Sequence, residues 1–164
     1  MLPVFAHVNS IVGHLLAASE NYVCMKLLKE KNSTIKPQLL DAGINLGERP
    51  FVEEVFYDLE TLIITLNPDV SGKMVRIIFD TVRGFRCLDE GDLTDFWADN
   101  FIQKNWLFEI TAGGWFDQEA KREGFMHWYI DREFFICGVN DCVSVLASEP
   151  PKFEIVEVAL NSES

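Results

Sequence analysis

The chain has 164 residues, and its 14 Lys and Arg stand against 26 Asp and Glu, which gives a formal net charge of −12 at pH 7. Apolar residues make up 48% of the sequence and charged residues 24%, so the chain can bury a core, and intrinsic disorder is excluded. The acidity counts against nucleic acid as a partner, because affinity for a phosphate backbone comes largely from Lys and Arg. The length favours a single domain over residues 1–164.

Cysteine usage and hydropathy indicate a cytoplasmic protein. The four cysteines form no Cys-x-x-Cys pair, and three of them lie among apolar neighbours, as buried reduced thiols do. The apolar N-terminus has no Lys or Arg before Lys26, which argues against a signal peptide. No stretch approaches the roughly 20 apolar residues of a membrane span. We therefore expect a cytoplasmic location and no membrane partner.

Residues 1–50 are predicted to be mainly helical. Asn9 or Ser10 can cap a first segment and Ser19 a second, because their side chains accept hydrogen bonds from the first helical N–H groups. Part of the second segment fits a strand equally well. A third helical turn is expected between Pro37 and Gly43, with proline at its start and glycine at its end.

From residue 51 to residue 160 the sequence is predicted to be mainly β, with two short helices. The best hairpin joins a strand over residues 55–66 to one over residues 73–81, through a turn that contains Asn67, Pro68 and Gly72. The remaining strands are expected at Trp106–Thr111, Glu133–Val139, Val143–Ala147 and Phe153–Val158. The short helices are expected to open near Asp92 or Thr94 and near Asp117, the second ending at Gly124.

Strands that follow one another through short turns pair antiparallel, because a parallel crossover needs a dozen or more residues. The expected fold class is therefore α+β. It consists of a single curved, mostly antiparallel β-sheet with N-terminal helices and with short helices between strands. No internal repeat or linker divides the chain.

The densest charge feature runs from Leu88 to Asp99 and holds five acidic side chains and no basic one. Helix capping explains Asp92 and also fits Asp89. Asp95 and Asp99 would share one helical face, where their mutual repulsion destabilises the isolated protein. Such a cost suggests a partner of opposite charge, although a solvated helix face is the alternative. The residues predicted to bind a partner here are Asp89, Glu90, Asp95, Trp97 and Asp99.

Aromatic residues extend this predicted interface. Tryptophan is enriched where proteins bind one another, so Trp97 in the acidic stretch and Trp115 after the diglycine turn are candidate anchors. Both also fit an ordinary core position. Asp117, two residues beyond Trp115, completes the predicted set of partner-binding residues.

Catalytic and metal-binding signatures are missing from the sequence. There is no Gly-x-Ser-x-Gly elbow, no phosphate loop, no calcium loop and no zinc-type spacing of the histidines. We therefore expect no enzyme activity, no cofactor and no metal. A small-ligand-binding or hydrolytic enzyme that uses carboxylates in a β-lined pocket remains the alternative function. An adaptor subunit and a cysteine nucleophile paired with His127 also stay open.

The C-terminal half carries several motifs, namely Gly84-Phe85-Arg86-Cys87-Leu88-Asp89-Glu90-Gly91-Asp92-Leu93, Gly113-Gly114-Trp115, Glu123-Gly124-Phe125 and Asn140-Asp141-Cys142-Val143-Ser144-Val145-Leu146. With them the stretch Arg83–Pro151 resembles the small immunity proteins of bacterial polymorphic-toxin systems, those of contact-dependent growth inhibition being the nearest type. The resemblance implies a cytosolic antitoxin without catalysis of its own, which binds one toxin domain and blocks its active site. Contact residues do not transfer, because toxin-binding surfaces vary between members. A basic nuclease toxin would suit the acidic charge of this chain.

Overall fold

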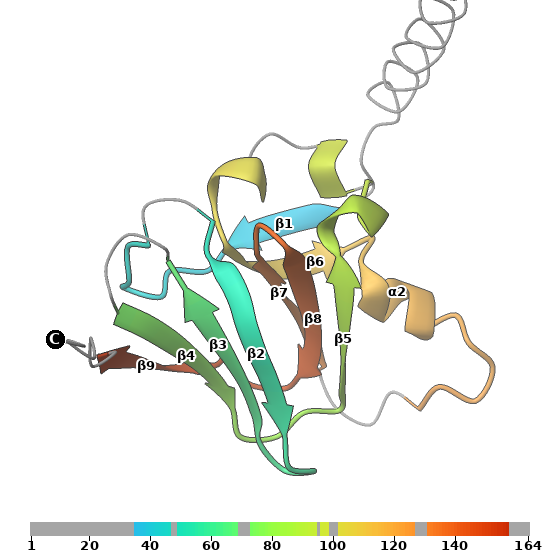
Figure 1. Cartoon of the computed structure of the whole chain (residues 1–164). Coiled ribbons are helices and arrows are strands. Elements are labelled where there is room, and N and C mark those ends of the chain that lie inside the picture. The colour runs from blue at the N-terminus through green and yellow to red at the C-terminus, as the bar shows by residue number, and fades with distance from the viewer. Residues whose placement is uncertain are drawn as a thin grey trace, which may run out of the picture. The chain divides into compact units, whose positions relative to one another are not determined.

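The computed structural model describes residues 35–46, 49–68, 73–94, 96–98, 102–126 and 131–157. All of them belong to one compact unit, residues 33–164. This part of the chain forms two antiparallel sheets (Figure 1). Sheet A has the order β1 (Lys36–Leu39), β6 (Leu107–Ala112), β7 (Arg132–Cys137), β8 (Asp141–Ala147) and β5 (Gly84–Asp89). Sheet B has the order β2 (Phe51–Tyr57), β3 (Leu62–Asn67), β4 (Lys73–Phe79) and β9 (Lys152–Glu157).

The main core lies between the two sheets. Successive side chains of a strand point to opposite faces, so every second side chain of β3 and β4 faces the core. Ile64 pairs with Ile77 across these two strands. Both side chains are fully buried against the facing residues of β7 and β8. The buried members of this cluster are Leu62, Ile64, Leu66, Val75, Ile77, Phe79, Leu107, Phe134, Ile136, Val143, Val145 and Ala147.

A second core covers the other face of sheet A. Short 3₁₀ turns lie on this face, namely η1 (Glu90–Asp92), η2 (Phe96–Ala98) and η3 (Ile102–Lys104). Phe96 of η2 stacks on Phe135 of β7, with ring centroids 4.4 Å apart, and Ile102 is fully buried beside them. Sheet A is therefore the middle layer, which explains why β7 and β8 are apolar at positions of both parities.

The expected α+β fold on a single curved sheet with N-terminal helices is wrong. The third predicted helical turn, Pro37–Gly43, is overturned because residues 36–39 form β1. β1 is an edge strand, where a proline without an N–H group is tolerated. The two segments expected to start near Asn9 and Ser19 lie outside the described residues. In the described part of the chain, α2 (Trp115–Glu119) is the single α-helix, and it is short.

Individual strands agree better with the sequence. The hairpin of β3 and β4 is confirmed, and β6 to β9 start and end within two residues of their predicted bounds. The predicted strand over residues 55–66 is instead divided between β2 and β3. Neither β1 nor β5 was expected, and the two sheets arise because the double-sided apolar strands need a second layer.

The turn between β2 and β3 contains an unusual leucine. Leu59 has a φ of 80°, which is left-handed backbone that strains a residue with a Cβ, and its side chain is 83% exposed. Asp58 holds the turn, because its carboxylate accepts hydrogen bonds from the N–H groups of Glu60 (3.0 Å) and Thr61 (2.7 Å). These two bonds also lower the pKa of Asp58. The turn is thus set by an aspartate rather than by glycine.

No helix in the described ranges is sufficiently long and apolar to pass through a lipid bilayer.

Substituting Leu59→Gly should stabilise the protein, because glycine adopts a positive φ without strain. The relief exceeds the extra freedom that glycine gives the unfolded chain, so we expect a gain of about 0.5–1 kcal/mol in the free energy of unfolding. Urea denaturation measures it. Leu59→Ala is the matched control, since it removes the exposed side chain and keeps the strain. A glycine variant no more stable than the alanine variant would contradict the strained-turn interpretation.

Candidate interaction face and adjoining cleft

Three carboxylates gather where β5 and β8 lie side by side at one end of sheet A. Asp89 is directly opposite Asp141 in the register of the two strands, and Glu90 follows Asp89 into η1. None of the three forms an ion pair with any described residue. Like charges placed opposite each other across a strand pair destabilise the fold. We call Asp89, Glu90 and Asp141 the acidic end.

The β7–β8 turn, which leads into Asp141 of the acidic end, is attached to β2. Asn140 joins the β7–β8 turn to β2, because its side-chain amide donates to the carbonyl oxygen of Val52 and accepts from its N–H group, both at 3.0 Å. The N–H group of Val139 donates to the carbonyl oxygen of Pro50 at 2.9 Å. This attachment brings the backbone of β2 to the turn that leads into Asp141, and the side chains of Phe51 and Val139 are each 38% exposed.

Asp89 and Trp97 also have local structural roles. The Asp89 carboxylate accepts the Gly91 N–H group at 2.8 Å and so caps η1, a role the sequence assigned first to Asp92. The indole N–H of Trp97 donates to the carbonyl oxygen of Glu90 at 2.7 Å, and the Arg49 guanidinium lies 5.1 Å from the ring centroid. Trp97 is half-buried. Trp97 therefore holds the backbone of Glu90 in place and does not project fully from the surface.

Asp95 and Asp99, two further predicted interface residues, lie outside the described residues. The structure therefore neither adds them to the acidic end nor removes them from it.

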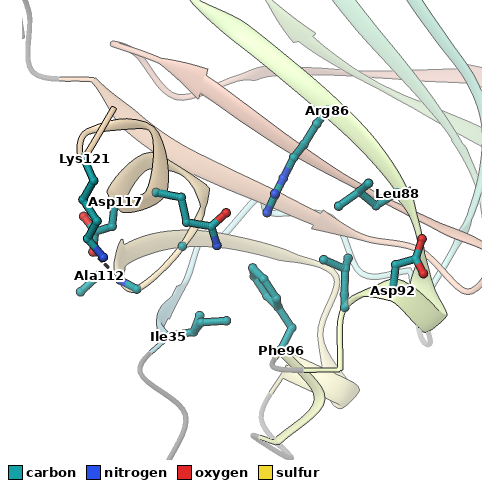
Figure 2. A pocket seen from close by; sticks show the side chains of 12 residues that line it. Ile35, Arg86, Leu88, Asp92, Phe96, Ala112, Asp117 and Lys121 are labelled. Atoms are coloured by element: carbon teal, nitrogen blue, oxygen red, sulfur yellow. Dashed lines mark hydrogen bonds between the residues drawn. The ribbon is translucent and has the colours of Figure 1, made fainter. Parts of the chain in front are cut away.

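A cleft of about 580 Å³ adjoins the acidic end, between β5, the 3₁₀ turns and the β6–α2 connection. Figure 2 shows Asp92 on one wall and Asp117, with Lys121 beside it, on the opposite wall. Arg86 of β5 points into the space between these walls. The cleft thus brings Asp117, predicted from the sequence, to the same hollow as Asp92.

Trp115 and Asp117 are held by hydrogen bonds within the β6–α2 connection. The indole N–H of Trp115 donates to Glu119 at 3.1 Å, and its ring centroid lies 5.3 Å from the Arg86 guanidinium. The Asp117 carboxylate accepts the Gly113 N–H group at 2.6 Å. Both side chains are half-buried, and the ring of Trp115 lies against the guanidinium of Arg86.

Glu133 of β7 is the buried acid beneath this region. It is 1% exposed, and its Oε2 accepts the backbone N–H group of Phe116 at 2.7 Å. A Cβ at Gly114 would collide with the same carboxylate, so only glycine permits this approach. The other oxygen, Oε1, has no hydrogen-bond partner among the described residues.

Burial shifts the pKa of both Glu133 and Arg86. Burial raises the pKa of Glu133, while the N–H groups of Phe116 and Trp115 and the charge of Arg86 act against the rise. Burial likewise lowers the pKa of Arg86, and the charges of Glu133 and Glu119 oppose that change. Glu133 and Arg86 carry opposite charges, and each partly opposes the effect of burial on the pKa of the other.

Sequence reasoning missed both Arg86 and Glu133. Each is a charged residue inside a short strand, and nothing in the spacing of either one indicates chemistry. The Gly113-Gly114 pair was the available signal, since a diglycine turn allows another group to approach the backbone.

The described residues contain no group of three or more His, Cys, Asp or Glu arranged to hold a metal ion. Cys137 and Cys142 are directly opposed in the β7–β8 register, and both thiols are buried and free.

Asp141→Asn should stabilise the isolated protein, because it removes the repulsion with Asp89 and leaves the η1 cap intact. We expect a gain of about 0.2–1 kcal/mol in the free energy of unfolding at low salt. The gain should shrink at high salt, since screening weakens repulsion between exposed charges. Glu154→Gln is the matched control, because Glu154 faces Arg76 across β9 and β4 and its loss should destabilise slightly. A destabilised Asp141→Asn protein would contradict the repulsion.

Glu133→Gln should change how stability depends on pH. A carboxyl whose pKa is raised in the folded protein binds its proton more tightly there, so the wild type loses stability as pH rises from the ordinary glutamate pKa to the raised one. Glutamine does not titrate. The unfolding free energy of Glu133→Gln minus that of the wild type should therefore increase as pH rises above the ordinary glutamate pKa of about 4.3.

Urea denaturation at a series of pH values measures this difference. Glu123→Gln is the control, because Glu123 is exposed in the turn after α2. A Glu133→Gln difference that stays constant or falls as pH rises would show that burial does not disfavour the charged form.

Comparison with known proteins finds no family model that matches the chain, and neither a curated protein nor a solved structure with significant similarity to it.

Proposed function

We propose that this chain is an immunity protein, an antitoxin that binds and neutralises a cognate basic toxin domain through its acidic end. The observation that carries the proposal is the pairing of Asp89 with Asp141 next to the turn that contains exposed Val139. Carboxylates that repel one another in the free protein are stabilised when a cationic surface covers them. The exposed side chain of Val139 would supply apolar contact area at the same place.

Charge also favours this kind of partner. The chain carries a net charge of −12, and a complementary basic domain would be attracted to it over long distances. An inhibitor must reach a toxin before the toxin reaches its substrate, so a fast association rate is useful. A nuclease domain fits best, because its cleft uses basic side chains to hold phosphates. The resemblance to immunity proteins of contact-dependent growth inhibition supports the same proposal.

The proposed mechanism is occlusion by a protein surface and requires no catalytic group of this chain. Asp89 and Glu90 would contact the basic rim of the toxin, with Trp97 fixing the backbone of Glu90 behind them. Asp117 lies on the far wall of the cleft, and Trp115 precedes it by two residues, so the two would extend the interface. The proposed partner is a protein, expected in the bacterial cytoplasm.

The test uses the protein encoded by the reading frame directly upstream of this chain. Wild-type chain should protect bacteria that express that protein, and the two should associate more slowly as salt rises. The double variant Asp89→Asn/Asp141→Asn should associate about tenfold more slowly at low salt, because two steering charges are lost. Growth curves and binding kinetics at two salt concentrations provide the readouts.

Glu60→Gln/Glu154→Gln is the matched control. It removes the same total charge from exposed positions of the β2–β3 turn and β9, and should leave association nearly unchanged. Equal slowing in both double variants would exclude the acidic end as the binding face. A wild-type chain that neither binds nor protects would refute the immunity function.

A further inference from the structure

Arg86 is a half-buried cation in the cleft, and the described residues form a hydrogen bond with only part of its guanidinium group. The Nε atom of Arg86 makes a long contact of 3.5 Å with the Ser144 hydroxyl, and the ring of Trp115 lies against the guanidinium. Its two terminal nitrogens form no hydrogen bond or ion pair with the residues that the structure describes. Figure 2 shows this end of the side chain directed into the cleft. A guanidinium so placed presents two parallel donors to an incoming ligand.

The charged residues around the cleft favour a ligand that carries a single negative charge. Lys121 and Asp117 lie together on one wall, and Asp92 lies on the other. Glu133, buried nearby, and Glu119 already offset part of the charge of Arg86. A doubly charged phosphate would be repelled by Asp92 and Asp117. A single negative charge, divided over two oxygens, matches the one available guanidinium.

The rest of the cleft is largely apolar on the side of the 3₁₀ turns. Leu93 and Phe96 belong to the second core and reach the cleft, together with Ile35 and Leu88. A volume of about 580 Å³ lies within the usual range of roughly 300–1,000 Å³ for small-molecule sites. An apolar wall that faces the guanidinium of Arg86 suits an amphipathic anion.

We infer that the cleft binds a small monocarboxylate that carries an apolar group. The carboxylate would accept two hydrogen bonds from the guanidinium of Arg86, and the apolar group would lie against Leu88, Leu93 and Phe96. The ring of Trp115 lies against the guanidinium of Arg86 and limits its movement. The ligand would contact neither Asp89 nor Asp141, so the substitutions that test the acidic end leave this site unchanged.

The experiment is titration calorimetry of the full chain with hexanoate and benzoate as probes. Hexanamide is the uncharged counterpart of hexanoate, and inorganic phosphate tests whether any anion suffices. We expect both carboxylates to bind, and hexanamide and phosphate to bind at least about tenfold more weakly. The NMR signals of the Trp115 indole and of Gly113 and Gly114 should shift with hexanoate.

Two substitutions locate the binding. Arg86→Met should weaken hexanoate by about tenfold or more, because the charged donors are lost. Arg76→Met is the matched control, since Arg76 is an exposed arginine on β4 and should leave binding unchanged. Arg86→Lys keeps the charge and loses the paired donors, so it should weaken binding several-fold even if the methionine variant does not fold.

Several results would overturn the inference. One is the absence of binding by both carboxylates at about 10 mM, where even a weak site would be detected. Others are equal affinity for hexanamide or phosphate, and equal loss of affinity in the Arg76 control. Neither these results nor their opposites bear on toxin binding, which the protection assay measures separately.

Discussion

The double-sided burial of β7 and β8 is the constraint on which the rest of the fold depends. Both strands bury side chains of both parities, from Glu133 to Cys137 and from Cys142 to Ala147. Each face of sheet A must therefore be covered, one by sheet B and the other by the 3₁₀ turns and Ile35. The acidic end and the cleft lie where these coverings meet the edge strand β5, so both sites follow from the need to enclose sheet A.

Strand positions were predictable wherever alternation or a turn signal was strong. Lys73–Phe79 alternates clearly, and Gly138–Asn140 marks the β7–β8 turn. The β2–β3 turn was missed because Leu59 occupies a position where the rules expect glycine or asparagine. The division into two sheets was missed because an apolar run reports burial without saying which element covers it.

The site was predictable in part, for a similar reason. The acidic stretch drew attention to Asp89 and Glu90, but Asp141, which lies opposite Asp89, comes from a distant part of the chain. Arg86 gave no signal, because its importance comes from burial and from the partners it lacks within the described residues. A sequence shows where charged residues are dense. Whether one charged side chain has partners of opposite charge depends on how the chain folds.

The attachment of Asn140 to Val52 has a consequence for self-association. β2 is an edge strand, and edge strands expose N–H and C=O groups that can pair with another chain. The amide of Asn140 occupies both backbone groups of Val52, as a neighbouring strand would. Glu53 and Glu54 follow directly and add charge along the same edge. One side chain thus joins the two sheets and also discourages pairing of another chain with the β2 edge of sheet B.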